Sequence, residues 1–236
     1  MEKKLKIVLF AYNFPHRKTA DFIDKIYECG FQINLILAAH FITIKSPKSI
    51  FLFNKKTPLI SLKEQAIKKD IPLYEVTHNS SESKSLLKKY HINFGIISGA
   101  RILSKEITSS LRNGILNFHP GLLPVIRGLD SILWSIYKDH PIGATAHLIN
   151  DKIDAGFLVC QNTISIEKTD NIQSLYEKNY QLQLDLISIS LNLVLKKNNF
   201  TALKMGEYNH KMPYETQVDL REKLEKYLHK YSSIKA

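Results

Sequence analysis

The chain has 236 residues, of which 44% are hydrophobic, and its formal net charge at pH 7 is +11. This length fits one sizeable domain with an appendage, and the apolar content is sufficient for an ordinary core, which excludes a disordered chain. The opening apolar run, residues 5–11, is too short to span a bilayer and lacks a small-residue cleavage site, so we expect no membrane association. The two cysteines, Cys29 and Cys160, are too few for a disulfide framework and lack metal-ligand spacing, so we expect core positions and a cytoplasmic protein.

The positive charge is spread along the chain. Lysine pairs such as Lys55-Lys56 and Lys196-Lys197 recur without an arginine-rich block or interleaved aromatic residues, so nucleic-acid binding is not favoured. A solvated basic surface is the simpler interpretation. Such a surface still attracts anionic ligands, and we expect an anionic small molecule as the partner.

The first half of the chain alternates between apolar runs and amphipathic segments. We expect helices at residues 19–29, 62–69, 82–90 and 105–112, and strands at residues 5–11, 31–38, 72–76, 94–97 and 114–118. This alternation predicts the α/β class, with a Rossmann-like, mainly parallel sheet flanked by helices. Residues 40–58 lack periodicity and are rich in Pro, Ser and Lys, so we expect a loop that borders the binding site.

The second half predicts fewer and longer elements. We expect helices at residues 131–138 and 172–197, and strands at 142–149 and 155–162. The tail contains a short strand or hairpin followed by a charged helix at 215–231. Its narrow apolar seam is consistent either with packing on the same chain or with a homodimer, and consists of Val218, Leu224, Leu228 and Tyr231. We therefore expect a domain at 1–199 with a short C-terminal extension at 200–236.

The most informative stretch is residues 117–128, with the sequence Asn-Phe-His-Pro-Gly-Leu-Leu-Pro-Val-Ile-Arg-Gly. The strand expected at 114–118 runs into this loop, so Asn117 and His119 lie at the carboxyl end of the strand. In open parallel sheets ligands bind at this edge, because strand-end side chains and helix amino termini meet there. Taken alone, His-Pro-Gly is more often a structural turn in which the imidazole satisfies a backbone carbonyl.

Further features follow in order and favour a site over a turn. Arg127-Gly128 ends the loop, a helical pattern containing Trp134 comes next, and Gly-Ala-Thr-Ala-His at 143–147 leads to Asp-Ala-Gly at 154–156. The chain thus has an amide, an imidazole and a carboxylate in one constellation. Acyl-transfer chemistry can use all three.

From about residue 72 to residue 161 the chain resembles the folate-dependent formyltransferases. These include enzymes that act on methionyl-tRNA, on glycinamide ribonucleotide and on nucleotide sugars. The resemblance is carried by Asn-x-His before Leu-Leu-Pro-x-x-Arg-Gly and by Asp-x-Gly beyond the next strand. It implies Asn117, His119 and Asp154 as the catalytic residues, and 10-formyltetrahydrofolate as formyl donor without a metal. It also implies a pterin pocket formed largely by main-chain groups at Arg101, Ile102, Leu103, Asn150 and Ile153.

The chemistry of these residue types agrees with the resemblance. Transfer of a formyl group to an amine passes through a tetrahedral intermediate with a negative oxygen, which the amide of Asn117 and a protonated His119 can stabilise. A carboxylate at Asp154 favours the protonated imidazole, fixes its orientation and can relay the proton that the amine loses. No nucleophilic Ser or Cys is needed, so we expect direct transfer.

Two departures from the family pattern narrow the choice among the three classes of formyl acceptor. Residues 11–19 contain no glycine, so the phosphate-cradling loop of glycinamide ribonucleotide enzymes is not expected. The segment after Phe200 is much shorter than the tRNA-contacting domain of methionyl-tRNA enzymes. These departures favour a nucleotide-linked amino sugar, although both other acceptors and a non-catalytic folate- or nucleotide-binding module stay open. The candidate acceptor-binding residues are Tyr12, Asn13, Arg127 and Trp134.

Overall fold

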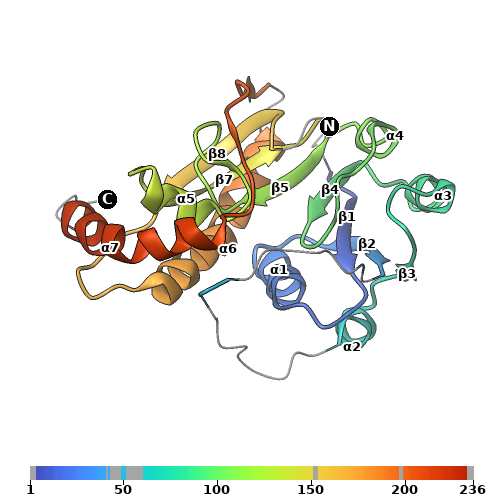
Figure 1. The fold of residues 1–236 in the computed structure, drawn as a ribbon. Helices are drawn as coiled ribbons and strands as arrows, with labels where there is room; N and C mark the ends of the chain where they lie inside the picture. The colour runs from blue at the N-terminus through green and yellow to red at the C-terminus, as the bar shows by residue number, and fades with distance from the viewer. Residues whose placement is uncertain are drawn as a thin grey trace.

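The computed structural model describes residues 4–40, 42, 49–51, 61–150, 154–196 and 199–232. Its centre is an eight-stranded sheet in the order β3-β2-β1-β4-β5-β7-β8-β9 (Figure 1). Strands β1 to β5 are parallel, and β7, β8 and β9 continue the sheet in antiparallel pairings. The strands are β1 Ile7–Tyr12, β2 Ile33–Ala39, β3 Leu73–Glu75, β4 Phe94–Ile97, β5 Ile115–His119, β7 Gly143–Leu148, β8 Phe157–Thr163 and β9 Thr201–Ala202. The predicted α/β class with a mainly parallel sheet is confirmed.

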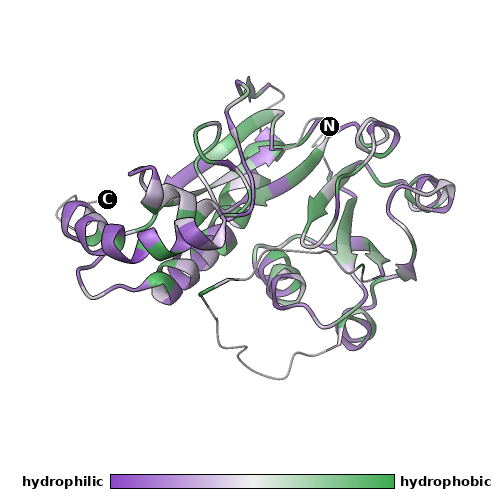
Figure 2. Ribbon diagram, viewed as in Figure 1, coloured by the Kyte–Doolittle hydropathy of each residue, from purple (hydrophilic) through white to green (hydrophobic). Residues whose placement is uncertain are grey.

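Helices cover both faces of the sheet. They are α1 Arg17–Glu28, α2 Leu62–Lys68, α3 Ser81–Lys89, α4 Lys105–Thr108, α5 Ser131–Tyr137, α6 Ile172–Lys196 and α7 Tyr214–Tyr231. Side chains of β1 alternate between the faces, as the pleat requires: Leu9 contributes to the core under α1, α2 and α6, and Phe10 to the core under α3 and α4. Figure 2 shows the resulting pattern, with hydrophobic strands at the centre and polar outer helix surfaces.

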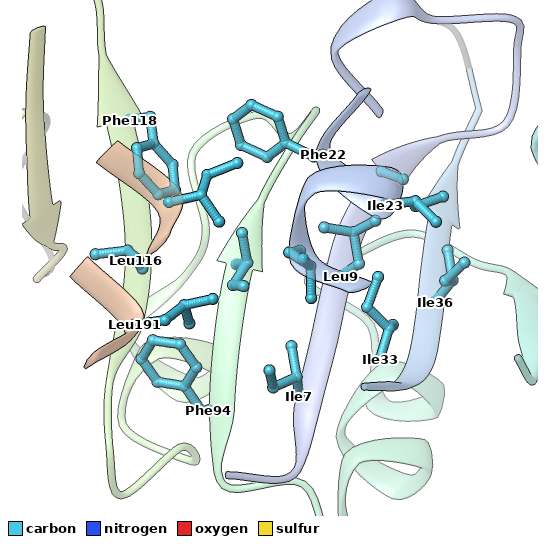
Figure 3. Close-up of a cluster of buried hydrophobic side chains, with 14 of the residues drawn as sticks. Ile7, Leu9, Phe22, Ile23, Ile33, Ile36, Phe94, Leu116, Phe118 and Leu191 are labelled. Atoms are coloured by element: carbon cyan, nitrogen blue, oxygen red, sulfur yellow. The ribbon is translucent and has the colours of Figure 1, made fainter. Parts of the chain in front are cut away.

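The core on the α1 and α6 side supports the strand that carries the motif. Phe22 of α1 packs edge-to-face on Phe118 of β5, with ring centroids 5.2 Å apart. Leu191 of α6 belongs to the same buried cluster as Leu116, and Figure 3 shows these side chains converging on β5. Because Leu116 and Phe118 point into this core, the alternate residues Asn117 and His119 project from the opposite face of the sheet.

The C-terminal helix packs on its own chain. Leu220, Tyr227 and Leu228 of α7 are buried in a third cluster together with Ile132 and Ile136 of α5. Figure 1 shows α7 running beside α5. The predicted apolar seam therefore packs internally, with Leu224 and Tyr231 partly buried there as well. Val218 differs from the prediction, because it is 47% exposed.

Several element boundaries differ from those predicted. The helix expected at 105–112 ends at Thr108, and the strand expected from residue 155 begins at Phe157. The later start follows from backbone angles, because Asp154 and Gly156 have φ values of 45° and 106°, outside the extended region. Cys29 and Cys160 are half-buried free thiols and not interior residues. Most of the loop predicted at 40–58 lies outside the described residues.

A small second sheet was not expected from the sequence. Strand β6, Arg127–Gly128, pairs in parallel with β10, Tyr208–Asn209. Two-residue strands leave no periodic signal, so the tail was predicted only as an unspecified strand or hairpin. Among the described helices, none is both long enough and apolar enough to cross a membrane.

Candidate active site

The candidate site lies at the pairing of β5 with β7, where the parallel part of the sheet ends and the antiparallel part begins. Asn117 is opposite His147 in this pair, and His119 is opposite Thr145. Residues two apart on a strand share a face, so all four side chains come from adjoining positions on one side of the sheet. Thr145 stabilises the loop that follows β5, since its hydroxyl donates to Gly121 O at 2.7 Å and accepts from Leu123 N at 3.0 Å.

The amide of Asn117 is oriented by His147. The Nδ1 atom of His147 lies 2.9 Å from Ala155 O, and because a carbonyl can only accept, Nδ1 carries the hydrogen. Burial lowers the pKa of this fully buried imidazole to about 4, so the ring is neutral at pH 7 and Nε2 is an acceptor. Asn117 Nδ2, 3.1 Å away, therefore donates to Nε2, and its second hydrogen is the donor that it can offer to a ligand. Sequence reasoning assigned no role to His147.

His119 is held by one backbone and one side-chain partner at the same nitrogen. Its side chain is 4% exposed, and Nε2 lies 2.8 Å from Ile126 O and 3.3 Å from Ser131 Oγ. Nε2 therefore carries a hydrogen, again because its carbonyl partner can only accept. The other nitrogen, Nδ1, lies 3.5 Å from Oδ1 of Asp154. Proton exchange at this imidazole thus takes place at Nδ1, beside the carboxylate.

Burial opposes the charged form that we expected for His119. Burial is the largest effect and lowers the pKa of His119, while Asp154 and the Ile126 carbonyl raise it and Lys18 lowers it further. The net direction is downward, because desolvation of the imidazolium costs more than the neighbouring carboxylate restores. Burial therefore works against the protonated imidazole that the sequence suggested.

Asp154 reaches His119 from the loop between β7 and β8. Its Oδ2 accepts a hydrogen bond of 3.0 Å from the backbone N–H of Gly128 in β6, while Oδ1 faces His119. Its left-handed backbone, with φ of 45°, is one that Asp and Asn adopt more readily than most residues. The three residues predicted as catalytic therefore converge in the structure.

A chain of polar side chains, half-buried at Lys18 and buried at Gln183 and Asn179, lies behind β5 and was missed by sequence reasoning. Lys18 Nζ donates to Phe118 O at 3.2 Å and to Gln183 Oε1 at 3.0 Å. Gln183 Nε2 donates to Asn179 Oδ1 at 3.0 Å, and Asn179 Nδ2 donates to Gly143 O at 2.7 Å. Burial lowers the pKa of Lys18 to about 8. Two amides four residues apart on the apolar stripe of α6 were the available signal, because buried amides need partners.

The loop predicted to hold the formyl donor follows β4, next to β5. Asn79 fixes this loop by donating from Nδ2 to Ile102 O at 2.9 Å and accepting from Ser104 N at 2.8 Å. Leu103 is buried, whereas Ile102 is 64% exposed and Arg101 is also exposed. Main-chain groups at this sheet edge are thus held in place by a side chain that sequence reasoning did not single out.

The second part of the predicted pocket is only partly described. Asn150 follows β7 and is half-buried, whereas Ile153 lies outside the described residues. Arg101 is close enough to Tyr12 to lower the pKa of the phenol, although burial has the larger, opposite effect. The loops after β1 and β4 therefore adjoin, so candidates for donor and acceptor binding lie near one another.

The loop after β1 is built from aromatic rings. Tyr12 stacks on Phe14 with centroids 5.1 Å apart and an interplanar angle of 13°. Asn13 points elsewhere, because its Nδ2 lies 2.6 Å from His40 Nδ1 and 3.3 Å from Glu75 Oε2. These partners follow or end β2 and β3, on the side of β1 opposite to β4 and β5. The structure therefore separates Asn13 from Asn117, His119 and Asp154.

The other two acceptor-binding candidates contact the C-terminal segment. Arg127 is 9% exposed, its Nη1 donates to Gly206 O at 3.1 Å, and its guanidinium lies 5.3 Å from the ring centre of Tyr208. Trp134 Nε1 donates to His210 O at 2.8 Å. Both side chains thus have partners within the chain, and acceptor binding by them stays a prediction. Within the described residues no group of His, Cys, Asp or Glu side chains is arranged to hold a metal ion.

Comparison with known proteins extends these observations. The model of the formyl transferase family matches residues 36–188. Over 167 residues the chain is 29% identical to methionyl-tRNA formyltransferase of Flavobacterium psychrophilum. This alignment covers 70% of our chain and 53% of the relative. Over 196 residues it is 28% identical to the bifunctional polymyxin resistance protein ArnA of Wigglesworthia glossinidia brevipalpis. This second alignment covers 81% of our chain and 28% of that protein. The chain spans about half the length of the methionyl-tRNA formyltransferase.

Solved structures share the fold. A phosphoribosylglycinamide formyltransferase from Bacillus halodurans superimposes with a TM-score of 0.62 at 22% identity, covering 81% of this chain and 96% of the other. A sugar N-formyltransferase from a Shewanella species gives 0.61 at 21% identity, covering 88% and 77%. The family match spans more than half of this chain and contains Asn117, His119 and Asp154. The chain therefore belongs to the formyl transferase family.

Proposed function

We propose that this protein transfers a formyl group from 10-formyltetrahydrofolate, the donor that the family uses, to the amine of a nucleotide-linked amino sugar. The observation that carries the transfer reaction is the convergence of Asn117, His119 and Asp154 at one strand end. The Nδ1 atom of His119 lies 3.5 Å from Asp154 Oδ1, and the amide of Asn117 has a fixed donor direction.

Each of these residues has a role in direct transfer. The acceptor amine attacks the formyl carbon, and the free N–H of Asn117 donates to the oxygen that becomes negative. The attacking nitrogen then loses a proton, which Asp154 or Nδ1 of His119 accepts. Because Asp154 raises the pKa of His119, the carboxylate stabilises the imidazolium once that proton arrives. Collapse of the tetrahedral intermediate breaks the bond between the formyl carbon and the donor nitrogen. His119 or Asp154 then passes the accepted proton to that nitrogen, which restores all three groups.

Features beside the site support folate binding. Ile102 exposes an apolar side chain, and Asn79 fixes the main chain at Ile102 and Ser104. An apolar surface with a few placed main-chain groups is the kind of lining that takes a flat heterocycle with a polar edge. The folate supplies the transferable formyl group, and the protein residues orient it.

Two observations favour a nucleotide-linked amino sugar as acceptor. The loop after β1 has stacked Tyr12 and Phe14 instead of glycines, so it offers aromatic surface and not a backbone cradle for phosphate. Residues 201–232 fold back on the domain through β10 and α7 instead of forming a separate tRNA-contacting unit. The net charge of +11 suits an anionic acceptor of this type.

Methionyl-tRNA is the second candidate acceptor, because the relative from Flavobacterium psychrophilum is a methionyl-tRNA formyltransferase. A direct comparison decides between them. Purified protein is incubated with formyl-labelled 10-formyltetrahydrofolate and, at equal concentration, with an amino-sugar nucleotide panel, charged initiator tRNA or glycinamide ribonucleotide. We expect label only in the amino-sugar nucleotides. Efficient transfer to the tRNA, with none to any sugar nucleotide, would overturn the proposed acceptor.

The catalytic assignment has its own test. His119→Asn removes the proton-accepting Nδ1 and the charge that develops there, so turnover should fall by about a hundredfold or more. Circular dichroism checks that the variant is folded. Near-normal turnover by folded His119→Asn protein would contradict the role assigned to this imidazole.

A further inference from the structure

The C-terminal segment contacts the loop that carries the catalytic constellation. Residues 206–212 lie beyond residues 36–188, the part of the chain that the family model matches. Within this segment β10 pairs with β6, so that Tyr208 is opposite Arg127 and Asn209 is opposite Gly128. Nothing in the family match therefore explains what this segment does at the site.

Asn209 is the central residue of this contact. It is 4% exposed, and its Nδ2 donates to Arg127 O at 2.9 Å. Its own backbone carbonyl accepts from Leu129 N at 2.8 Å. Asn209 thus binds both sides of Gly128, and loss of its amide would leave the buried carbonyl of Arg127 without this donor.

The two backbones approach each other closely at Gly128. A Cβ atom at this position would lie 2.2 Å from Asn209 O, and the residue has φ of 101°. Glycine alone meets both conditions, because other side chains clash and disfavour this angle. The β6–β10 contact is therefore a tightly packed feature and tolerates little displacement.

The same short stretch of loop holds two catalytic residues. Gly128 N donates to Asp154 Oδ2 at 3.0 Å, and Ile126 O accepts from Nε2 of His119 at 2.8 Å. Residues 126–128 thus set the relative positions of the carboxylate and the imidazole. A displacement of β6 would move both partners of the 3.5 Å pair between Asp154 and His119.

We propose that Asn209 is a positioning residue for formyl transfer, acting through β6 on Asp154 and His119. Its side-chain amide holds the loop at Arg127, its backbone carbonyl holds the loop at Leu129, and the loop holds the two catalytic side chains. This inference rests on the proposed function and assigns a catalytic contribution to the C-terminal segment.

The first test replaces the amide. Asn209→Ala removes the donor, and Asn209→Asp keeps the size but puts an oxygen against the carbonyl of Arg127. Because a misplacement of about 1 Å can cost a hundredfold in rate, we expect kcat to fall about 10- to 100-fold in both variants, with KM for the formyl donor changed less than about threefold. The matched control is Asn192→Ala, which removes an exposed asparagine whose Nδ2 donates to Ser188 O at 2.9 Å on α6.

The second measurement does not depend on turnover. Asp154 raises the pKa of His119, so release of the carboxylate in Asn209→Ala should shift the imidazole titration, followed by NMR, to lower pH. A purely structural role would lower thermal stability and leave this titration unmoved. If the parent protein transfers no formyl group, the proposed function fails, while the NMR titration still decides whether Asn209 positions the pair.

A backbone variant gives a second route to the same contact. Gly128→Ala forces β6 away from Asn209 and should reduce kcat at least as strongly as Asn209→Ala. Gly30→Ala is its control, because Gly30 also has a positive φ, of 80°, but a Cβ atom there would meet no other atom within 4 Å. Asn209→Ala with kcat per folded molecule equal to that of Asn192→Ala, and with an unshifted His119 titration, would overturn the proposal.

Discussion

Replacement of His147 separates the stability of the site from its catalytic alignment. Burial lowers the pKa of this histidine from 6.5 to about 4 in the folded protein. The unfolded chain therefore binds a proton more readily, and stability falls as pH decreases through the window from 6.5 to 4. Because each pKa unit corresponds to about 1.4 kcal/mol, His147 alone should cost about 2 kcal/mol of stability between pH 7 and pH 5.

Two amide variants, each reproducing the position of one ring nitrogen, separate the two hydrogen bonds of the ring. Gln at position 147 reaches about as far as Nε2 and can accept from Asn117, whereas Asn reaches about as far as Nδ1 and can donate to Ala155 O. Neither titrates, so both should remove this contribution of about 2 kcal/mol to the pH dependence. Only His147→Asn leaves Asn117 without its acceptor, and loss of an aligned oxyanion donor lowers kcat by about 10²- to 10³-fold. His147→Gln should stay within about tenfold of the parent.

Urea unfolding at pH 7 and pH 5, together with steady-state kinetics at pH 7, measures both effects. His78→Gln is the matched control, since His78 is a buried histidine with a lowered pKa whose Nε2 contacts Leu37 O at 3.0 Å. It should change stability and leave formyl transfer unaffected. The reasoning is refuted if the His147 variants retain the pH dependence of the parent, or if His147→Asn and His147→Gln turn over equally.

Three further outcomes are expected. Asp154→Asn keeps an oxygen that can accept from Gly128 N–H, and asparagine tolerates the same positive φ, so the variant should fold normally. Its turnover should fall about a hundredfold or more, because the imidazolium of His119 loses the neighbouring carboxylate; kinetics and melting temperature test this. Burial holds the pKa of Lys18 at about 8, below its usual 10.5, so the parent should gain about 2 kcal/mol between pH 7.5 and pH 9.5; urea unfolding should show no such gain in Lys18→Met. Leu228→Ala should cost about 2 to 4 kcal/mol of unfolding free energy because Leu228 is 7% exposed, whereas Val218→Ser, at a site 47% exposed, should change it by less than about 0.5; equal losses would contradict the packing of α7.

Much of the fold could be predicted because its signals are local. Apolar runs such as residues 94–97 and 114–118 indicate buried strands by their composition alone, and the structure has β4 and β5 at these positions. Boundaries were less accurate where backbone angles decide them. The start of β8 at Phe157 depends on the positive φ of Asp154 and Gly156, which neither residue type requires.

The same distinction holds for the candidate site. The convergence of Asn117, His119 and Asp154 follows from a motif at the end of one strand and a second motif beyond the next. The hydrogen-bond partner of Asn117 does not follow from these motifs, because the pairing with His147 depends on the antiparallel register between β5 and β7. Register is a property of two strands together. The intramolecular contacts of Arg127 with Gly206 likewise join residues 79 apart in the chain.

The sequence by itself determined the α/β class, the strand that carries the motif and the residue types available for chemistry, because periodicity and motif spacing are properties of short segments. Only the tertiary structure decided that burial lowers the pKa of His119 and that β10 packs against β6 at Gly128. The physical reason is common to both. Desolvation of a side chain and close approach of two backbones depend on atoms contributed from the whole chain, and no local pattern encodes which distant residues will surround a given group.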